Sequence, residues 1–125
     1  IPAASPLNTY PLQVFINTII SATARVGYVA VPLGGAGTIV SATAVCDATP
    51  TVGSAVFTGA IGSTAITNGA ITVATTDTLG TAKTVVPTAE NVVAGGNVIK
   101  FTTSGANTAA GTAMITLTIL RSPPA

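Results

Sequence analysis

Residues 113–120 read Ala-Met-Ile-Thr-Leu-Thr-Ile-Leu, and this stretch indicates most clearly which fold the chain adopts. Its alternate positions 113, 115, 117 and 119 hold apolar residues, whereas Met114, Thr116 and Thr118 lie between them. Successive side chains of a β-strand point to opposite faces of the sheet. The alternation therefore predicts a strand that buries one face against a hydrophobic core.

Shorter β-type segments, separated by Gly, Pro, Asn and Asp, precede this strand along most of the chain. We expect strands near residues 24–31, 38–46, 54–58, 70–75, 83–86 and 98–103, with Phe57 and Phe101 in the core. Asn68-Gly69 is a strong tight-turn signal, because both residue types tolerate positive φ. Residues 47–51, 95–97 and 105–107 are expected to form turns or loops. This pattern predicts an all-β sandwich or barrel with essentially no long helix.

The N-terminal region differs from the rest in its prolines. Pro2, Pro6 and Pro11 each fix φ and lack an amide donor. We therefore interpret residues 1–23 as an extended Pro-rich arm, residues 24–121 as the sandwich domain and residues 122–125 as a C-terminal tail.

The end of this arm is strongly apolar. Residues 13–20 read QVFINTII, and because they follow the prolines directly we expect them to pack on a partner protein. The side chains expected to bind that partner are Tyr10, Leu12, Val14, Phe15 and Ile16.

Composition narrows the possible functions. Charged residues are 6% of the 125 residues and the net charge is +1, whereas about a quarter of a typical soluble domain is charged. So uncharged a surface is expected to be covered by copies of the chain or by a partner. Disorder is disfavoured because 48% of the residues are hydrophobic.

The basic residues Arg25, Lys83, Lys100 and Arg121 lie far apart in sequence, so we expect no direct nucleic-acid binding. The uncharged stretch 26–46 contains Pro32 and a Gly cluster, so we expect no membrane helix.

The chain has few residues that could carry chemistry. It contains no His, so Ser-His-Asp triads and His-metal sites cannot assemble. We interpret Asp47, Asp77 and Glu90, the only carboxylate side chains, as turn or surface groups. Cys46 stands alone and is expected to be a buried apolar residue. Residues 34–37 are Gly-rich but no Gly-Lys-Ser/Thr follows, which indicates a loop without phosphate binding. We therefore expect no enzymatic activity, no metal and no cofactor.

Four segments together carry a resemblance to a known family. They are VPLGGAGTIVSATAVCD (31–47), AIGSTAITNGAITVAT (60–75), VPTAENVVAGGNVIKFTTSG (86–105) and AMITLTILR (113–121). In this order the chain from about residue 28 to residue 121 resembles the jelly-roll domains of tailed-phage head decoration, cement or head-fibre proteins. Residues 87–91 and 95–99 are the most characteristic matches, although Asn97 stands where the family pattern has Asp.

This resemblance implies a jelly-roll-like β-sandwich that acts as a structural virion protein. It implies a homotrimer that binds the major capsid protein on the outer capsid surface and stabilises the head, and it implies no catalytic residue. Two other functions remain open. One is a filament subunit that donates QVFINTII to the sheet edge of the next copy. The other is a phage fibre or adhesin domain that binds a host-surface glycan, although the chain has few aromatic residues and no Trp.

Overall fold

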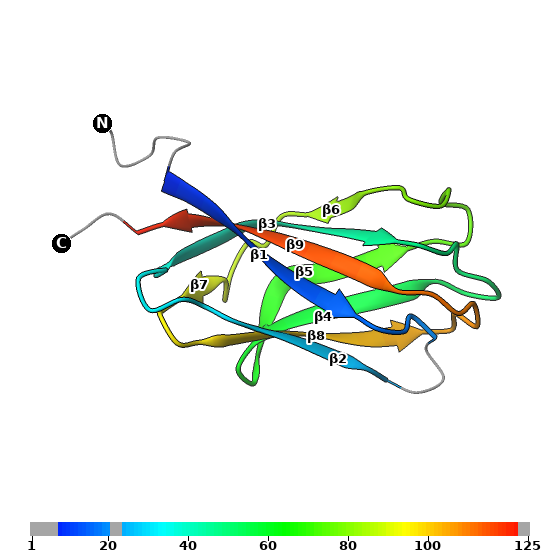
Figure 1. Cartoon of the computed structure of the whole chain (residues 1–125), viewed down its shortest axis with the longest axis horizontal. Coiled ribbons are helices and arrows are strands. Elements are labelled where there is room, and N and C mark those ends of the chain that lie inside the picture. The colour runs from blue at the N-terminus through cyan, green and yellow to red at the C-terminus, as the bar shows by residue number, and fades with distance from the viewer. Residues whose placement is uncertain (1–7, 21–23, 123–125) are drawn as a thin grey trace.

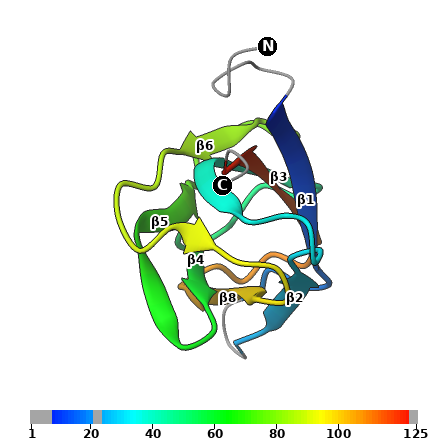
Figure 2. The same ribbon diagram turned by 90° about the vertical axis from the view of Figure 1, so that its left-hand side faces the viewer.

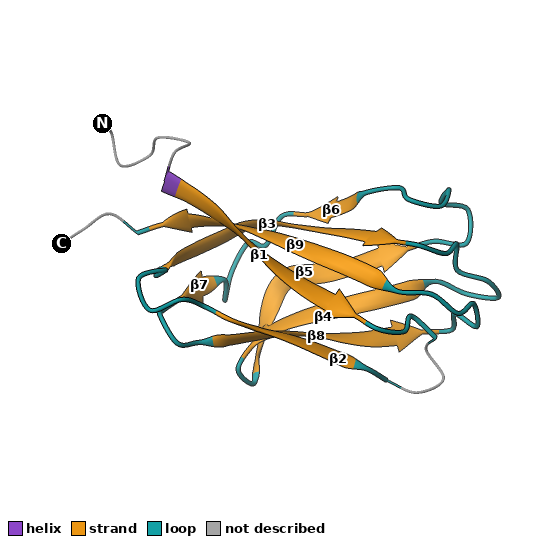
Figure 3. Cartoon of the chain, viewed as in Figure 1, coloured by secondary structure: helices purple, strands orange, loops and turns teal. Residues whose placement is uncertain are grey.

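The computed structural model describes residues 8–20 and 24–122. Within these residues the chain forms nine β-strands and no α-helix, as the sequence predicts (Figures 1 and 3). In chain order the strands are β1 (Thr9–Ile16), β2 (Val26–Ala30), β3 (Gly37–Cys46), β4 (Ala55–Ile61), β5 (Thr64–Val73), β6 (Lys83–Val85), β7 (Val92–Val93), β8 (Val98–Gly105) and β9 (Ala113–Arg121).

The strands form two antiparallel sheets that pack face to face (Figure 2). One sheet has the order β1-β9-β3-β6, with the two-residue β7 also paired to β3, and the other has the order β2-β8-β4-β5. Most connections, including those from β1 to β2 and from β2 to β3, cross from one sheet to the other. Apart from the short β7, this is the eight-stranded jelly-roll arrangement. The expected jelly-roll-like β-sandwich is confirmed.

The hydrophobic core lies between the two sheets. Strand β9 contributes its alternate residues Ala113, Ile115, Leu117 and Ile119, as the sequence pattern predicts. The opposite sheet contributes the buried rings of Phe57 and Phe101 and the side chains of Ile71 and Ile99, so both phenylalanines lie where they were expected. Burying one such large side chain stabilises the fold by roughly 1.5–3 kcal/mol.

The expected N-terminal arm is corrected by the structure, because residues 9–16 form β1 inside the sandwich. β1 pairs with β9 from Thr9↔Leu120 to Ile16↔Ala113, and Val14 and Ile16 are fully buried in the core. The sandwich therefore begins at Thr9 and not at residue 24. Residues 1–7 and 21–23 of the predicted arm, and residues 123–125 of the predicted tail, lie outside the described residues.

A proline within a strand explains why the sequence of this segment resembles that of an extended arm. Pro11 lies in β1, which is the edge strand of its sheet, and edge strands tolerate proline because one side of the ladder has no partner. Locally, a proline in an edge strand and a proline in an extended arm leave the same sequence signal. The alternation of Leu12, Val14 and Ile16 was the better guide, since these residues face inward while Gln13 faces outward.

The tight turn expected at Asn68-Gly69 is also corrected. The β4–β5 hairpin turns instead at Gly62-Ser63, where Gly62 has a φ of 61°. Asn68 does adopt a positive φ of 58°, but it does so in a bulge within β5. Its side-chain amide donates a hydrogen bond to the Val86 carbonyl, 2.7 Å away, and so holds the bulge against the segment after β6.

One buried polar side chain joins three connections of the sandwich. The Oδ1 atom of Asn107 accepts hydrogen bonds from the amides of Thr51 and Ala109, both at 2.9 Å. Its Nδ2 group donates to the carbonyls of Ile19 at 2.8 Å and Ala109 at 3.1 Å. All four hydrogen bonds that an Asn side chain can make are formed. Asn107 thereby ties the segment after β1 and the β3–β4 loop to the β8–β9 loop.

Replacing Ile16 with Ala tests whether β1 belongs to the core. A buried Ile→Ala change lowers the free energy of unfolding by about 2–5 kcal/mol. The matched control is Phe15→Ala at the adjacent position, whose outward side chain is 54% exposed and whose loss should stay below about 1 kcal/mol. Denaturant unfolding followed by circular dichroism measures both changes. Wild-type stability of Ile16→Ala would contradict the placement of β1 in the sandwich.

Replacing Asn107 with Asp should make stability depend on pH in a new way. The ionised carboxylate faces two carbonyl oxygens and donates to neither, so we expect a loss of about 3 kcal/mol near neutral pH. The same contact raises the pKa of the new carboxyl in the folded state. Its penalty is therefore smallest below the unfolded pKa of about 3.9 and grows as the pH rises through the folded pKa.

Denaturant unfolding at about pH 4 and about pH 7 measures this difference. Asn107→Ala is the control, because it also loses the hydrogen bonds but adds no titratable group. The same pH dependence in both variants would rule out the carboxylate as its cause.

Candidate functional site

The outer face of the β1-β9-β3 sheet carries no charged residue. Outward side chains from the three strands lie side by side in four cross-strand rows. The rows are Thr9–Leu120–Thr38, Pro11–Thr118–Ser41, Gln13–Thr116–Thr43 and Phe15–Met114–Val45. We call these twelve positions the uncharged face. A hydrogen bond of 2.7 Å between the hydroxyls of Thr43 and Thr84 extends it onto β6.

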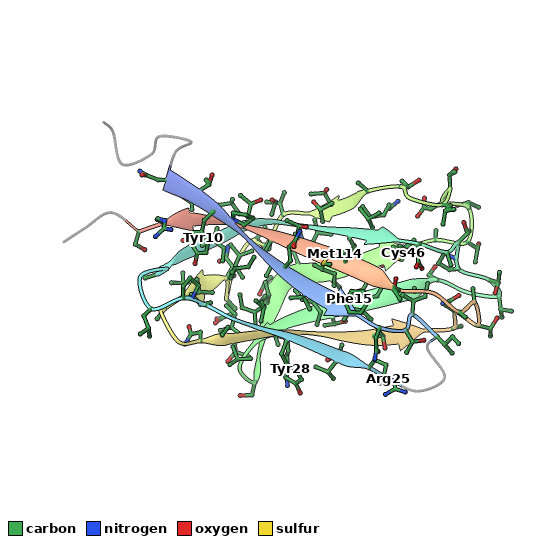
Figure 4. All side chains as sticks on the ribbon, in the orientation of Figure 1. Tyr10, Phe15, Arg25, Tyr28, Cys46 and Met114 are labelled. Carbon is green, nitrogen blue, oxygen red and sulfur yellow. The ribbon has the colours of Figure 1, made fainter. Side chains whose placement is uncertain are left out.

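One row of the uncharged face is apolar and open to solvent. Phe15 is 54% exposed, Val45 39% and Met114 37%, and the register places them next to one another across β1, β9 and β3. Figure 4 labels Phe15 and Met114 on their neighbouring strands. Aromatic rings and Met are enriched where proteins bind one another. This row is the most strongly apolar part of the face.

The structure separates the five side chains that the sequence assigned to partner binding. Phe15 alone projects onto the uncharged face. Val14 and Ile16 point into the core, so they cannot contact a partner while the sandwich is folded. Tyr10 and Leu12 are half-buried and pack against the core. Met114 and Val45 were missed, and the alternation of residues 113–120 already placed Met114 on the outward side.

Tyr10 is engaged within the chain. Its hydroxyl donates a short hydrogen bond to the Gly35 carbonyl, and the Arg121 guanidinium lies 4.6 Å from the centre of its ring. Arg121 also donates to the Gly34 carbonyl at 3.0 Å. Partial burial raises the pKa of the Tyr10 hydroxyl, and the positive charge of Arg121 offsets part of that rise. The Gly-rich segment is thus a loop, as its sequence indicated, and its contacts with Tyr10 fasten the start of β1.

Two of the three carboxylates hold turns. Asp47 accepts hydrogen bonds from the amide and hydroxyl of Thr112, at 2.6 and 2.8 Å, and these bonds lower the pKa of Asp47. Asp77 accepts from the Ala74 amide at 2.8 Å and pairs with Lys83 at 3.2 Å, and the Ala74 bond is the main reason that its pKa is lowered. Both carboxylates are occupied by structural contacts.

Glu90 and Cys46 are placed differently from these aspartates. Glu90 is exposed and lines a hollow of about 280 Å³ with Ile61, Thr64 and Val92, which offer no second titratable group. Cys46 is buried, and burial together with the negative charge of Asp47 raises its pKa to about 11. A thiol held in its neutral form is a poor nucleophile, so the interpretation of Cys46 as a structural residue is confirmed.

Two features are absent from the described residues. No group of three His, Cys, Asp or Glu side chains in that part of the chain is arranged to hold a metal ion. No helix in the described part is long and apolar enough to cross a membrane.

A larger groove lies at the edge of the sandwich where β1 and β2 approach each other. It has a volume of about 490 Å³ and is lined by Phe15, Ile16, Asn17, Ala24, Arg25, Val26, Gly27 and Tyr28. Phe15 and Tyr28 are exposed aromatic residues, and Arg25 is exposed beside them. The sequence did not single out this site, because only the pairing of β1 into the sandwich brings Phe15 near β2.

Comparison with known proteins identifies the fold without a family. No protein-family model matches the sequence, and no curated protein matches it. Among solved structures, the chain is similar to the carbohydrate-binding module CsCBM6-3 from Clostridium stercorarium in complex with cellobiose. The TM-score is 0.51 and the identity 16%, over 95% of this chain and 85% of that one. It is also similar to a chain of the capsid asymmetric unit of cyanophage Pam1. There the TM-score is 0.53 and the identity 17%, over 98% of this chain and 91% of that one. At these identities the likeness shows the β-sandwich fold.

Proposed function

We propose that this chain is a structural virion protein, a capsid decoration or cement protein that binds the outer capsid surface and stabilises the head. The observation that carries the proposal is the uncharged face. We propose this face as the attachment surface in place of the N-terminal segment, because Val14 and Ile16 of that segment are buried in the core.

The chemistry of the uncharged face suits a permanent protein contact. Covering a charged side chain removes it from water at a high cost, and this face has none to cover. Its Thr, Ser and Gln side chains can exchange hydrogen bonds with water for hydrogen bonds with a partner. The partner we propose is the major capsid protein, and no direct contact with nucleic acid or membrane is involved.

The size of the face favours attachment by several joined copies, and the assembly we propose is a homotrimer. Three antiparallel strands with four outward residues each span a face on the order of 400 Å². A standard protein interface buries about 800 Å² on each partner, so one copy would bind weakly. Three copies joined in one assembly bind with higher overall affinity, because the second and third contacts form at high effective concentration.

The fold comparison supports the proposal. A sandwich of this shape occurs in the Pam1 capsid asymmetric unit, so such a fold can be part of a capsid. The filament alternative is less well supported, because residues 13–16, which it would donate to another copy, pair with the chain's own β9. The arrangement favours a subunit that is complete before it binds.

Introducing one charge on the uncharged face should weaken attachment. Val45→Lys places an ammonium in the apolar row, and burying it at an interface should weaken binding by at least about tenfold. Thr58→Lys is the matched control, because it adds the same charge at an exposed position of β4 in the other sheet. Co-sedimentation with capsids of the virus that encodes the chain measures occupancy. Equal occupancy of Val45→Lys and wild type, or equal loss in both variants, would exclude the uncharged face as the attachment surface.

The oligomeric state is a separate prediction. We expect light scattering to give three times the mass of one chain for the isolated protein. The Thr58→Lys and Val45→Lys variants should keep this mass if the trimer forms through other surfaces. A stable monomer at every accessible concentration would contradict a preformed trimer.

A further inference from the structure

We propose that the groove between β1 and β2 binds an acidic saccharide. The ligand class follows from two exposed aromatic rings, one guanidinium without a carboxylate partner among the described residues, and one amide, which together line a single open hollow. These groups belong to Phe15, Tyr28, Arg25 and Asn17. The proposal does not depend on capsid attachment, because the groove shares only Phe15 with the uncharged face.

The groove exists because β1 and β2 touch at a glycine. Gly27 is buried, and a Cβ atom there would lie 2.6 Å from the Phe15 carbonyl oxygen and 2.7 Å from a methyl group of Val14. The backbones of the two strands therefore meet with no side chain of residue 27 between them. Phe15 and Tyr28 project beside this contact from strands that are each paired within a sheet. The backbone positions of both aromatic residues are thus fixed by the strands before a ligand arrives.

The distribution of aromatic residues points to stacking. Phe57 and Phe101 are in the core, and the hydroxyl of Tyr10 is bound to Gly35. The remaining two, Phe15 at 54% and Tyr28 at 64% exposure, are the most exposed aromatic residues among those described, and both line the groove. Aromatic rings bury a large apolar area and have few rotatable bonds to fix. The apolar C–H face of a pyranose ring is a fitting partner for them.

The charges around the groove select an anionic ligand. The structure shows one ion pair among the described residues, Lys83–Asp77, so the Arg25 guanidinium has no carboxylate partner there. Lys100 lies directly opposite Tyr28 in the β2–β8 register and adds a second positive charge. The groove lining contains no acidic residue. A guanidinium binds a carboxylate or sulfate through two parallel hydrogen bonds, and the Asn17 amide can bind a sugar hydroxyl.

A saccharide fits the groove better than an acidic peptide does. The lining of the groove includes two exposed aromatic side chains, and a peptide of defined sequence requires separate pockets for its side chains. Figure 4 shows Phe15 on β1 with Arg25 and Tyr28 on the β2 side of the same edge. Tyr28 and Lys100 belong to the sheet opposite the uncharged face, so a ligand there leaves most of that face free.

Affinity electrophoresis of the full chain tests the proposal. The probes are polygalacturonate, which carries carboxylates, dextran sulfate, which carries sulfates, neutral dextran, and polyglutamate as an acidic peptide. We expect retardation by at least one anionic polysaccharide and not by neutral dextran or polyglutamate. Which of the two polysaccharides binds identifies the anionic group.

Three variants locate the binding. Tyr28→Ala and Arg25→Gln should each weaken binding by about tenfold or more. Lys83→Gln removes the same charge as Arg25→Gln at β6, far along the sheet order from β1, and should bind as the wild type does. Thermal melts establish that all three fold. Tyr28→Ala separates stacking from general charge attraction, because it leaves the net charge unchanged.

Several results would overturn the proposal. They are no retardation by either anionic polysaccharide, equal retardation by polyglutamate or neutral dextran, and wild-type binding by Tyr28→Ala. Loss of binding in Lys83→Gln equal to that in Arg25→Gln would do the same, since it would indicate attraction to the whole surface. Capsid binding is measured with other variants, so failure of one proposal leaves the other intact.

Discussion

Eight residue pairs join β1 to β9, and both candidate surfaces depend on that ladder. It places Val14 and Ile16 over the core, so that the space between the sheets is closed to water along one edge. It also puts the outward residues of β1 beside those of β9, which creates the uncharged face. Finally, it brings Phe15 close to β2 and so forms one wall of the groove. Without β1 the sandwich would lose part of its buried core, and it would also lose both the uncharged face and the groove.

The sequence was informative wherever a strand alternates strictly and lies between clear turn residues. Strand β9 and the burial of Phe57 and Phe101 followed from local pattern alone. The N-terminal strand did not, because Pro11 dominated the interpretation and because strand pairing joins residues about a hundred positions apart. Asn68 shows the same limit. Its positive φ was predictable, but whether it forms a turn or a bulge depends on where β4 ends.

The candidate sites were harder to predict than the fold for a related reason. Each site consists of residues, such as Val45, Met114 and Tyr28, that carry no functional signal within their own segments. They form a site only because strand pairing brings them side by side. Sequence composition did indicate that a large uncharged surface must exist. It could not say on which sheet the apolar row would lie, since that follows from the pairing of β9 with both of its neighbours.

The contacts of Asp47, Asp77 and Cys46 determine how these residues make the stability of the fold depend on pH. Hydrogen bonds lower the pKa of both aspartates, so the stability that they contribute is present above their unfolded pKa and is lost only as the pH falls through the lowered value. Cys46 is shifted the other way, and its contribution is lost only as the pH rises toward about 11. The chain has no His to titrate between these limits. From about pH 5 to about pH 8 these two aspartates and Cys46 therefore bind the same number of protons in the folded and unfolded states, and their contacts keep the same strength across that range.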